Sequence, residues 1–411
     1  MSEISDPYKP GMAEIAREQA LYPLESPEKV KSGKKSLKIG IPIETSLQEN
    51  RVPLKPESIE ILIQHGHEIV VETRAGEMSD FRDDQFSEAG AQISYDHKEI
   101  FQSDIVLKVE PPTEYELEML KPGVTLISAF QTGTQSIEYL QALARKKVTA
   151  IGYEFIEDKV GGLPLVRAMS EIAGSSVMLI AAELLSRTNG GRGVILGGVT
   201  GVPPTKVVIL GAGTVAEYAA RAAMGLGVDI KIFDNHIYKL RRLKHAIGQQ
   251  VHTSTIDNAA LAAAVAEADV VIGAVRAEKG RNKMVVSEEM VSRMKPGSVI
   301  IDVSIDQGGC IETSRQTSLK HPIFTVYDII HYGVPNIASR VSQTASVAIS
   351  NIFTPLLLQV AEAGGIEEMI FTNKGFMKGV YMYKGSLTNL HLARKYNMGY
   401  KDLSLLMAAR F

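Results

Sequence analysis

The chain has 411 residues and a formal net charge of −3, with 45% apolar and 22% charged residues. This length exceeds one ordinary hydrophobic core, so two domains are expected, and the near-neutral charge argues against a nucleic-acid partner. The single cysteine, Cys310, excludes an internal disulfide framework and fits a reducing compartment. The N-terminus lacks the features of a signal peptide, and no uninterrupted run of about 18 apolar residues occurs. We therefore expect a cytoplasmic protein without a membrane segment.

Residues 1–36 form a polar N-terminal extension that contains several prolines and ends in a lysine-rich stretch. Beyond it, apolar strand-like segments alternate with helical ones, and a helix is predicted over residues 56–66, closed by Gly66. The strands are expected at residues 36–44, 67–73, 103–110, 124–130 and 148–154. Alternation of strands and helices of this length predicts a parallel sheet.

Residues 206–234 carry the most specific motif of the chain, KVVILGAGTVAEYAARAAMGLGVDIKIFD. An apolar strand leads into a glycine-containing turn, a helix of small residues follows, and a second apolar strand ends the motif. Gly211 permits the tight turn, Gly213 leaves the backbone open to a pyrophosphate, and Ala216 lets the helix pack closely on the strand. This pattern predicts a Rossmann-type dinucleotide-binding unit.

The start of that helix and the end of the second strand complete the predicted dinucleotide site. Free N–H groups at Thr214 and Val215, together with the helix dipole, suit the phosphates. Asp234 falls at the spacing of a carboxylate that accepts hydrogen bonds from the adenosine ribose hydroxyls, and it would repel a 2′-phosphate. The motif therefore favours NAD over NADP. The alternative is a tight strand-to-helix turn that binds nothing.

Three more strands are predicted after the motif, at residues 268–275, 298–306 and 324–329. The first is expected to end near Gly273, the second at Asp306, and the third is expected to be the last strand. Long apolar helices are predicted at residues 168–186 and 341–358, and short helices from 366 to 411.

Two long helices around one nucleotide-binding unit indicate a chain that leaves a first domain, builds a second and returns to the first. The predicted fold class is α/β, with two Rossmann-like doubly wound domains, the first discontinuous, joined by two long helices with a cleft between them. The expected boundaries are an extension at 1–36, a first domain at 37–164 and 343–411, and a nucleotide-binding domain at 165–342.

Five segments together resemble the alanine dehydrogenase family, which also includes the first domain of proton-translocating nicotinamide nucleotide transhydrogenase. They are IGIPIETSLQENRVPLKP (39–56), LPLVRAMSEIAG (163–174), GGRGVILGGVTGVPP (190–204), MKPGSVIIDVSIDQGGC (294–310) and GSLTNLHLARKY (385–396). The resemblance covers roughly residues 37–395, nearly the whole chain, and unrelated NAD domains do not share this set.

The resemblance implies a substrate site on the first domain, which would then be the catalytic domain. Arg51 matches the family's carboxylate-binding arginine, whose guanidinium holds a carboxylate in a fork. Lys108 follows an apolar strand and matches a lysine that pairs with the substrate carboxylate or carbonyl oxygen. The alternative for each is a solvated surface cation.

Asp306 matches an aspartate that, in alanine dehydrogenases, lies beside the nicotinamide and takes part in proton handling. The corresponding segment of the transhydrogenase domain lacks this aspartate, so Asp306 favours an amino-acid dehydrogenase. The alternative is an aspartate that caps a turn.

Two positions depart from the alanine dehydrogenase pattern. Gln131 stands where the family has a histidine thought to bind the pyruvate carbonyl and act as acid and base. Glutamine donates a hydrogen bond and orients the substrate, but it carries no proton near neutral pH. Arg167 stands where an apolar residue is usual; it is either a cofactor contact, as in the transhydrogenase domain, or an interface arginine.

The resemblance assigns further residues to the cofactor site. They are Met169, Ser170, Gly273, Ala274, Val275, Ser304 and Asn336, in addition to Arg167 and Asp306. Nine scattered histidines and one cysteine make no metal-ligand cluster, so no metal is expected.

The leading hypothesis is an NAD-dependent dehydrogenase that reversibly converts a small L-amino acid, L-alanine first, to a 2-oxo acid and ammonium. Asp306, Gln131 and Lys108 would serve catalysis, and Arg51 with Lys108 would anchor the substrate. The rival, motivated by Gln131, is an NAD(H)-binding regulatory or transhydrogenase-like module without amino-acid turnover. Family members are hexamers or dimers, so a homo-oligomer is expected, with no nucleic-acid or membrane partner.

Overall fold

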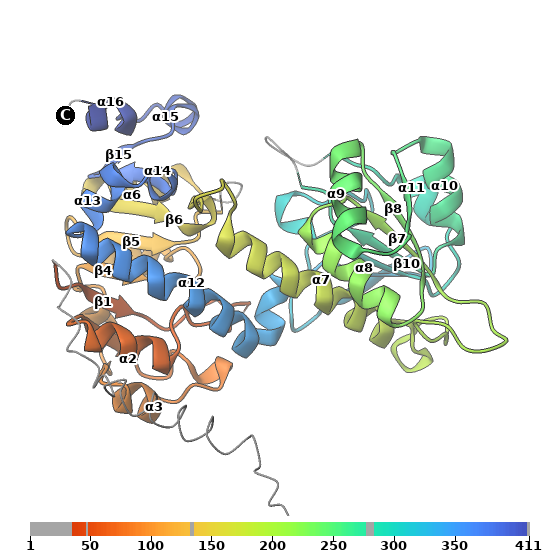
Figure 1. Cartoon of the computed structure of the whole chain (residues 1–411), viewed down its shortest axis with the longest axis horizontal. Helices are drawn as coiled ribbons and strands as arrows, with labels where there is room; N and C mark the ends of the chain where they lie inside the picture. The colour runs from red at the N-terminus through yellow and green to blue at the C-terminus, as the bar shows by residue number, and fades with distance from the viewer. Residues whose placement is uncertain (1–34, 47, 132–134, 277–282, 409–411) are drawn as a thin grey trace, which may run out of the picture.

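The computed structural model describes residues 35–46, 48–131, 135–276 and 283–408, so nearly all of the predicted N-terminal extension lies outside the described residues. The described residues form two sheets in separate lobes, one of eight strands and one of seven, each dominated by parallel pairs (Figure 1). The prediction of an α/β fold with two Rossmann-like units is confirmed.

The first sheet has the order β15-β14-β6-β5-β4-β1-β2-β3. Its strands are β1 (Lys38–Ile41), β2 (Glu68–Glu72), β3 (Gln92–Ser94), β4 (Ile105–Leu107), β5 (Thr125–Ser128), β6 (Thr149–Gly152), β14 (Val380–Tyr383) and β15 (Ser386–Leu387). Its helices are α2 (Pro56–Gln64), α3 (Asp83–Glu88), α4 (His97–Ile100), α5 (Glu114–Met119), α6 (Ile137–Arg145), α13 (Ile366–Thr372), α14 (Lys374–Met377), α15 (Leu390–Tyr396) and α16 (Leu403–Ala408).

The second sheet has the order β12-β13-β11-β10-β7-β8-β9. Its strands are β7 (Lys206–Leu210), β8 (Asp229–Phe233), β9 (His252–Ser254), β10 (Val270–Gly273), β11 (Val299–Asp302), β12 (Ile323–Val326) and β13 (Ile329–Tyr332). Its helices are α8 (Thr214–Gly225), α9 (Ile237–Ile247), α10 (Asn258–Glu267) and α11 (Glu288–Ser292). In both sheets the strand order reverses beside the first strand, β1 or β7, and ligands of such folds bind at the carboxyl ends of the strands at that point.

The cores follow from the alternation of side chains along each strand. Ile39 and Ile41 of β1 lie in one apolar cluster with helices α2 and α12 (Ser342–Ala363), whereas Val106 and Leu126 lie in a second cluster on the opposite face with α5 and α6. The seven-stranded sheet is covered in the same way, by α8 and α9 on one face and α10 and α11 on the other. Both faces of each sheet are buried, as expected for parallel strands.

Two helices of 22 residues each, the longest in the described part of the chain, contact each other. α7 (Pro164–Leu185) begins with Pro164 at its first turn and contacts α12, and α7 runs toward the second lobe in Figure 1. Gly174 lets α7 approach α8, because a Cβ there would lie 2.4 Å from the Val215 carbonyl oxygen. By length and composition alone, Pro164–Leu185 and Ile337–Ala363 are apolar enough to span a membrane, but half of each apolar stretch is buried in the protein.

Two expectations about strands were wrong. The segment 324–329 is not a single last strand but part of a hairpin of β12 and β13, because Tyr327 (φ 51°) and Asp328 (φ 58°) form a tight turn between them. The first sheet also gains β14 and β15 from the region where only short helices were expected.

Candidate functional site

The glycine turn after β7 has the backbone that the dinucleotide motif requires. Gly211 adopts φ +100°, and a Cβ on it would lie 2.4 Å from the carbonyl oxygen of Ala274. Apart from its own chain neighbours, no described residue has an atom within 4 Å of the position that a Cβ on Gly213 would take. Its side-chain space is therefore open, and a ligand phosphate can approach its backbone.

The helix that follows the turn offers its first amides to an anion. α8 begins at Thr214 and has no side-chain cap, so the amide groups of its first turn, Val215 included, are not used by a capping side chain. Ala216 is fully buried, as its predicted packing role requires.

Asp234 follows β8 directly and lies beside this turn. One carboxylate oxygen accepts the amide of Ala212 at 2.8 Å, and the other accepts the amide of His236 at 2.7 Å and faces its ring Nδ1 at 3.0 Å. Each carboxylate oxygen has two acceptor sites, so these contacts fix the side chain and still leave capacity for hydroxyl donors.

Asp302 organises the loop at the end of β11, and the sequence reasoning missed it. Its carboxylate accepts the amides of Ser304 at 3.1 Å and of Cys310 at 2.9 Å. Gly273 is required beside it, because a Cβ there would lie 2.9 Å from Asp302 Oδ1 and 2.8 Å from Cys310 Sγ. Ser304 donates its hydroxyl to the Gly273 carbonyl oxygen at 3.3 Å, so the ends of β10 and β11 are tied together.

The prediction that Asp306 ends a strand was wrong. β11 ends at Asp302, whose carboxylate turns the chain by accepting the Ser304 amide, and Asp306 lies in the short 3-10 helix η4 (Ile305–Gln307). Asp306 is exposed, yet the protein around it desolvates the carboxyl group and raises its pKa, against the opposing charge of Arg276. A carboxyl group of raised pKa beyond a strand end is suited to proton transfer.

Arg51 is buried and paired with a carboxylate two residues away. Its Nε lies 2.7 Å and its Nη2 lies 2.5 Å from the two oxygens of Glu49, whose side chain is fully buried. Burial opposes the charge of Arg51, but Glu49 raises its pKa overall. The remaining nitrogen, Nη1, points at the sulfur of Met169 on α7 at 3.1 Å.

Lys108 follows β4 and is buried between two carboxylates. Its Nζ lies 2.7 Å from Glu116 Oε1 and 3.4 Å from Glu44 Oε2. Burial opposes the charge of Lys108, but both glutamates raise its pKa overall. Burial raises the pKa of Glu44 to about 7, against the opposing charge of Lys108.

Gln131 follows β5 in the left-handed region, with φ +51°, and its side chain is exposed. Glu154, which follows β6, holds this turn: one oxygen accepts the amides of Phe130 at 2.7 Å and of Gln131 at 3.0 Å. The other oxygen of Glu154 is buried and has no hydrogen-bond partner within the described part of the chain. Burial raises the pKa of Glu154, and Arg276 opposes this as it does at Asp306.

Contacts between the lobes gather several of the predicted residues. Asn336, with φ +58°, donates from Nδ2 to Glu49 Oε2 at 2.7 Å, and the amide of Asn50 donates to Ser339 Oγ at 2.9 Å. Together with the Arg51–Met169 contact, they join the loop after β1 to α7 and to the segment that precedes α12. Arg51 and Asn336 thus bind the same glutamate, and Met169 contacts Arg51.

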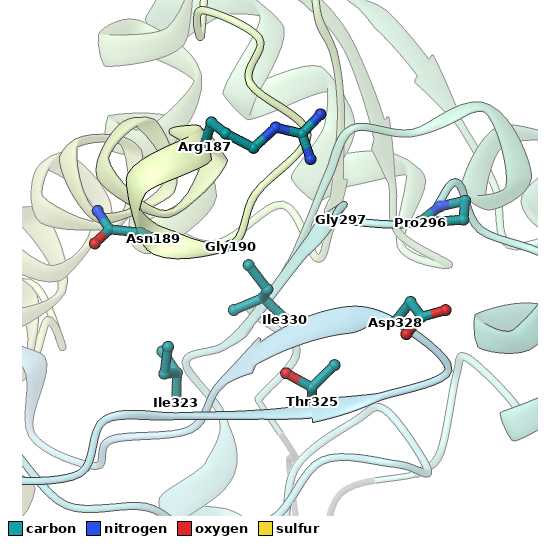
Figure 2. A pocket seen from close by; sticks show the side chains of 9 residues that line it. All are labelled: Arg187, Asn189, Gly190, Pro296, Gly297, Ile323, Thr325, Asp328 and Ile330. Atoms are coloured by element: carbon teal, nitrogen blue, oxygen red, sulfur yellow. The ribbon is translucent and has the colours of Figure 1, made fainter.

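A hollow of about 300 Å³ lies elsewhere (Figure 2). Its walls include Arg187, Gly297 and Asp328, and Gly297 and Asp328 precede β11 and β13. It therefore opens at the amino ends of these strands, opposite to Gly211 and Gly273, and is not the site described above.

Comparisons with known proteins agree with this geometry. Residues 40–173 match the family model "Alanine dehydrogenase/PNT, N-terminal domain", and residues 177–390 match "Alanine dehydrogenase/PNT, C-terminal domain". The chain belongs to the alanine dehydrogenase/PNT family.

Relatives in this family span almost the whole chain. Alanine dehydrogenase 2 from Staphylococcus aureus (strain USA300) is 38% identical over 368 residues, which are 89% of this chain and 98% of that protein. A solved L-alanine dehydrogenase superimposes with a TM-score of 0.82 at 37% identity, over 87% of this chain and 99% of that one. A transhydrogenase from Sinorhizobium meliloti, with a TM-score of 0.73 over 86% and 99% of the two chains, is 23% identical and shows the shared fold.

The remaining residues predicted for the cofactor site lie after β10 and on α7. Ala274 and Val275 follow β10, and the Ala274 amide donates to the Leu210 carbonyl oxygen at 2.8 Å beside the glycine turn. Ser170 lies half-buried on α7. Arg167, also on α7, has a side chain 72% exposed and pairs with Glu171 at 3.3 Å, which accounts for its charge without a ligand.

Sequence reasoning missed the carboxylates that surround the predicted cations. Glu44, Glu49 and Glu116 neutralise Arg51 and Lys108. Only Glu49, two residues from Arg51, gave a local signal; the other two glutamates reach Lys108 through the fold.

Proposed function

We propose that this chain is an NAD-dependent oxidoreductase that interconverts a small L-amino acid, with L-alanine as the first candidate, and its 2-oxo acid plus ammonium. Membership in the alanine dehydrogenase/PNT family over both domains supports this proposal. The single observation that carries it is the pair of buried cations, Arg51 and Lys108, at the carboxyl ends of neighbouring strands, where this fold binds its ligands.

The turn after β7 fits a nicotinamide dinucleotide. The open space at Gly213 and the uncapped start of α8 would receive the pyrophosphate, and Asp234 would accept the ribose hydroxyls. The carboxylate of Asp234 disfavours a 2′-phosphate, which supports NAD over NADP. The bound nicotinamide supplies the hydride chemistry, and the protein supplies position and charge.

The substrate's carboxylate would bind at the edge of Arg51 that Glu49 does not occupy. Glu49 takes Nε and Nη2, so Nη1, now against the Met169 sulfur, is the nitrogen available to a ligand. Lys108 has a third Nζ hydrogen beyond those directed at Glu44 and Glu116, and it would contact the carboxylate or carbonyl oxygen. Gln131 would orient the reacting group, and Asp306 would exchange protons with it.

A second candidate is an NAD(H)-binding module without amino-acid turnover. Gln131 favours it, because it carries no proton where the family's histidine would. The pairing of Arg51 with Glu49 also favours it, because half of the guanidinium is already occupied.

The deciding experiment follows loss of NADH absorbance with ammonium and a panel of 2-oxo acids, pyruvate first. Asp306→Asn is expected to lower kcat by about 10²–10⁴ with NADH binding retained. Asp328→Asn, an exposed aspartate at the opposite end of the sheet, is the matched control and should leave kcat unchanged. NADH binding without turnover of any acid would refute the enzyme and leave the second candidate.

We also propose that the protein acts in the cytoplasm as a homo-oligomer on a small-molecule substrate, without a nucleic-acid or membrane partner. The family membership supports the first part of this proposal, and light scattering of the purified protein tests the oligomer.

A further inference from the structure

A row of ionisable side chains leads away from Lys108 on the side of the first sheet that contains α4 and α5. Glu44 Oε2 lies 3.4 Å from Lys108 Nζ, and Lys108 Nζ lies 2.7 Å from Glu116 Oε1. His97 Nε2 lies 3.9 Å from the same Glu116 oxygen, and His97 Nδ1 lies 2.8 Å from Glu72 Oε2. The proposed chemistry uses only Lys108 from this row.

The row runs from the interior to the surface. The side chains of Glu44, Lys108 and Glu116 are 5%, 1% and 1% exposed, whereas that of His97 is 24% exposed. One end therefore lies in water, and the other lies among the predicted substrate-binding groups, because Glu44 interacts electrostatically with Lys108 and Glu49. A route for protons between a closed site and solvent needs side chains whose exposure rises from one end to the other, as it does here.

We propose that Glu44, Lys108, Glu116 and His97 form a proton path between the substrate site and solvent, which replaces the proton transfer that Gln131 does not perform. The inference rests on the proposed function, since it assumes that a substrate reacts beside Lys108.

Each step of the path balances. When water adds to the α carbon of the oxidised substrate, the new C–O bond forms, the C=N π electrons move to nitrogen, and Glu44 accepts the water's proton. Glu44 passes that proton to Lys108 Nζ as Lys108 gives one of its own to Glu116, so Lys108 remains an ammonium group. Glu116 passes a proton to His97, and His97 releases one to water. The reverse sequence brings a proton in for reductive amination.

The groups around both ends are suited to this transfer. Glu44 faces Lys108, Glu49 and Glu110, and its burial holds the pKa near 7, where a carboxyl group both takes and gives protons. His97 faces Glu72 from β2 and Glu116 from α5. The other charged residues on its own helix, α4, are Lys98 and Glu99. Its ring packs edge-on against the Phe101 ring, with the two ring centroids 5.1 Å apart. A small ring rotation or one bridging water spans the 3.9 Å gap to Glu116.

A purely structural role accounts for part of the row but not for all of it. Buried Lys108 needs Glu44 and Glu116 as counter-charges, whatever the function. It does not need His97, whose Nε2 lies 3.9 Å from Glu116 Oε1, beyond hydrogen-bond distance. His97 is therefore the residue that separates a proton path from a neutralised lysine.

The test measures kcat of His97→Gln at increasing concentrations of imidazole buffer, at one pH and constant ionic strength. A proton path predicts that kcat falls by about 10-fold or more, that KM for the 2-oxo acid is unchanged, and that imidazole restores kcat. His97→Ala leaves room for imidazole and should show larger rescue. His65→Gln, a partly exposed histidine on the same domain, is the matched control and should match the wild type at every concentration.

A His97→Gln variant with wild-type kcat would overturn the path, as would a loss of kcat that imidazole does not relieve in either His97 variant. A wild-type protein that turns over no 2-oxo acid would instead refute the proposed function, and the path with it. Circular dichroism of each variant, compared with that of the wild type, shows that it is folded.

Discussion

Replacement of Glu49 by glutamine should strongly destabilise the first domain. The carboxylate accepts hydrogen bonds from Arg51 N at 2.9 Å, Arg51 Nε at 2.7 Å, Arg51 Nη2 at 2.5 Å and Asn336 Nδ2 at 2.7 Å. Glutamine has the shape of glutamate but no negative charge, and its NH2 group would face the Arg51 or Asn336 donors, which require an acceptor.

The magnitude follows from burial. The Arg51 and Glu49 side chains are 7% and 0% exposed, so solvent barely screens the charge that Glu49→Gln leaves behind. Removal of one partner of a buried ion pair costs about 3–5 kcal/mol in the free energy of unfolding. At a urea dependence of about 2–3 kcal/mol/M, the unfolding midpoint should fall by roughly 1–2.5 M.

Urea unfolding followed by circular dichroism measures this shift. Glu57→Gln is the control, because that side chain is 69% exposed and its loss should change stability by less than about 0.5 kcal/mol. The double variant Glu49→Gln with Arg51→Met removes both charges and should recover at least about 2 kcal/mol relative to the single variant. A single variant within about 1 kcal/mol of the wild type, or a double variant no more stable than the single, would refute the reasoning.

Three further predictions concern the nucleotide turn, the acidic network and the thiol. Gly211→Ala should lower the free energy of unfolding by more than about 2 kcal/mol and abolish NADH binding, because Gly211 has a positive φ and its Cβ would lie 2.4 Å from Ala274. Gly213→Ala should leave the free energy of unfolding unchanged and weaken only NADH binding, which titration calorimetry measures. Equal effects of the two variants would contradict this reasoning. Since burial raises the Glu44 pKa from 4.5 to about 7, the folded state holds an extra proton between these values, so wild-type stability should fall as pH rises through them. In Glu44→Gln, the fall in the free energy of unfolding over this pH range should be smaller by up to roughly 3 kcal/mol. An unchanged slope of the urea midpoint against pH would exclude Glu44 as the source of the fall. Cys310 is fully buried and burial raises its pKa, so it should react with a thiol reagent only in denaturant; rapid reaction of the folded protein would place it at the surface.

Local signals in the sequence accounted for the nucleotide-binding unit. Gly211, Gly213, Ala216 and Asp234 are fixed by the geometry of two strands, one turn and one helix, so their spacing alone predicted where they lie. The strand end at Asp302 was missed because the bond that turns the chain, from the Ser304 amide to a carboxylate, has no signature in apolar periodicity. The hairpin at Tyr327 was missed for a similar reason, since its turn residues include no glycine.

The electrostatics of the predicted substrate site came from the tertiary structure. The sequence identified Arg51 and Lys108 as cations and has Glu49 two residues from Arg51, but it gave no sign that Glu44 and Glu116 are buried beside Lys108. Lys108 meets Glu44 because β1 and β4 are neighbours in the sheet although they are distant in the chain.

What the sequence by itself determined is the two-domain α/β fold, the dinucleotide turn and the family, because these rest on periodicity and short-range spacing. What only the tertiary structure decided is the charge balance of the site and its protons. Asn336 reaches Glu49 across 287 residues, and His97 comes to Glu116 because α4 and α5 contribute to the same apolar cluster. Coulomb interactions depend on distance in space and on burial, and neither quantity is written in the order of residues along the chain.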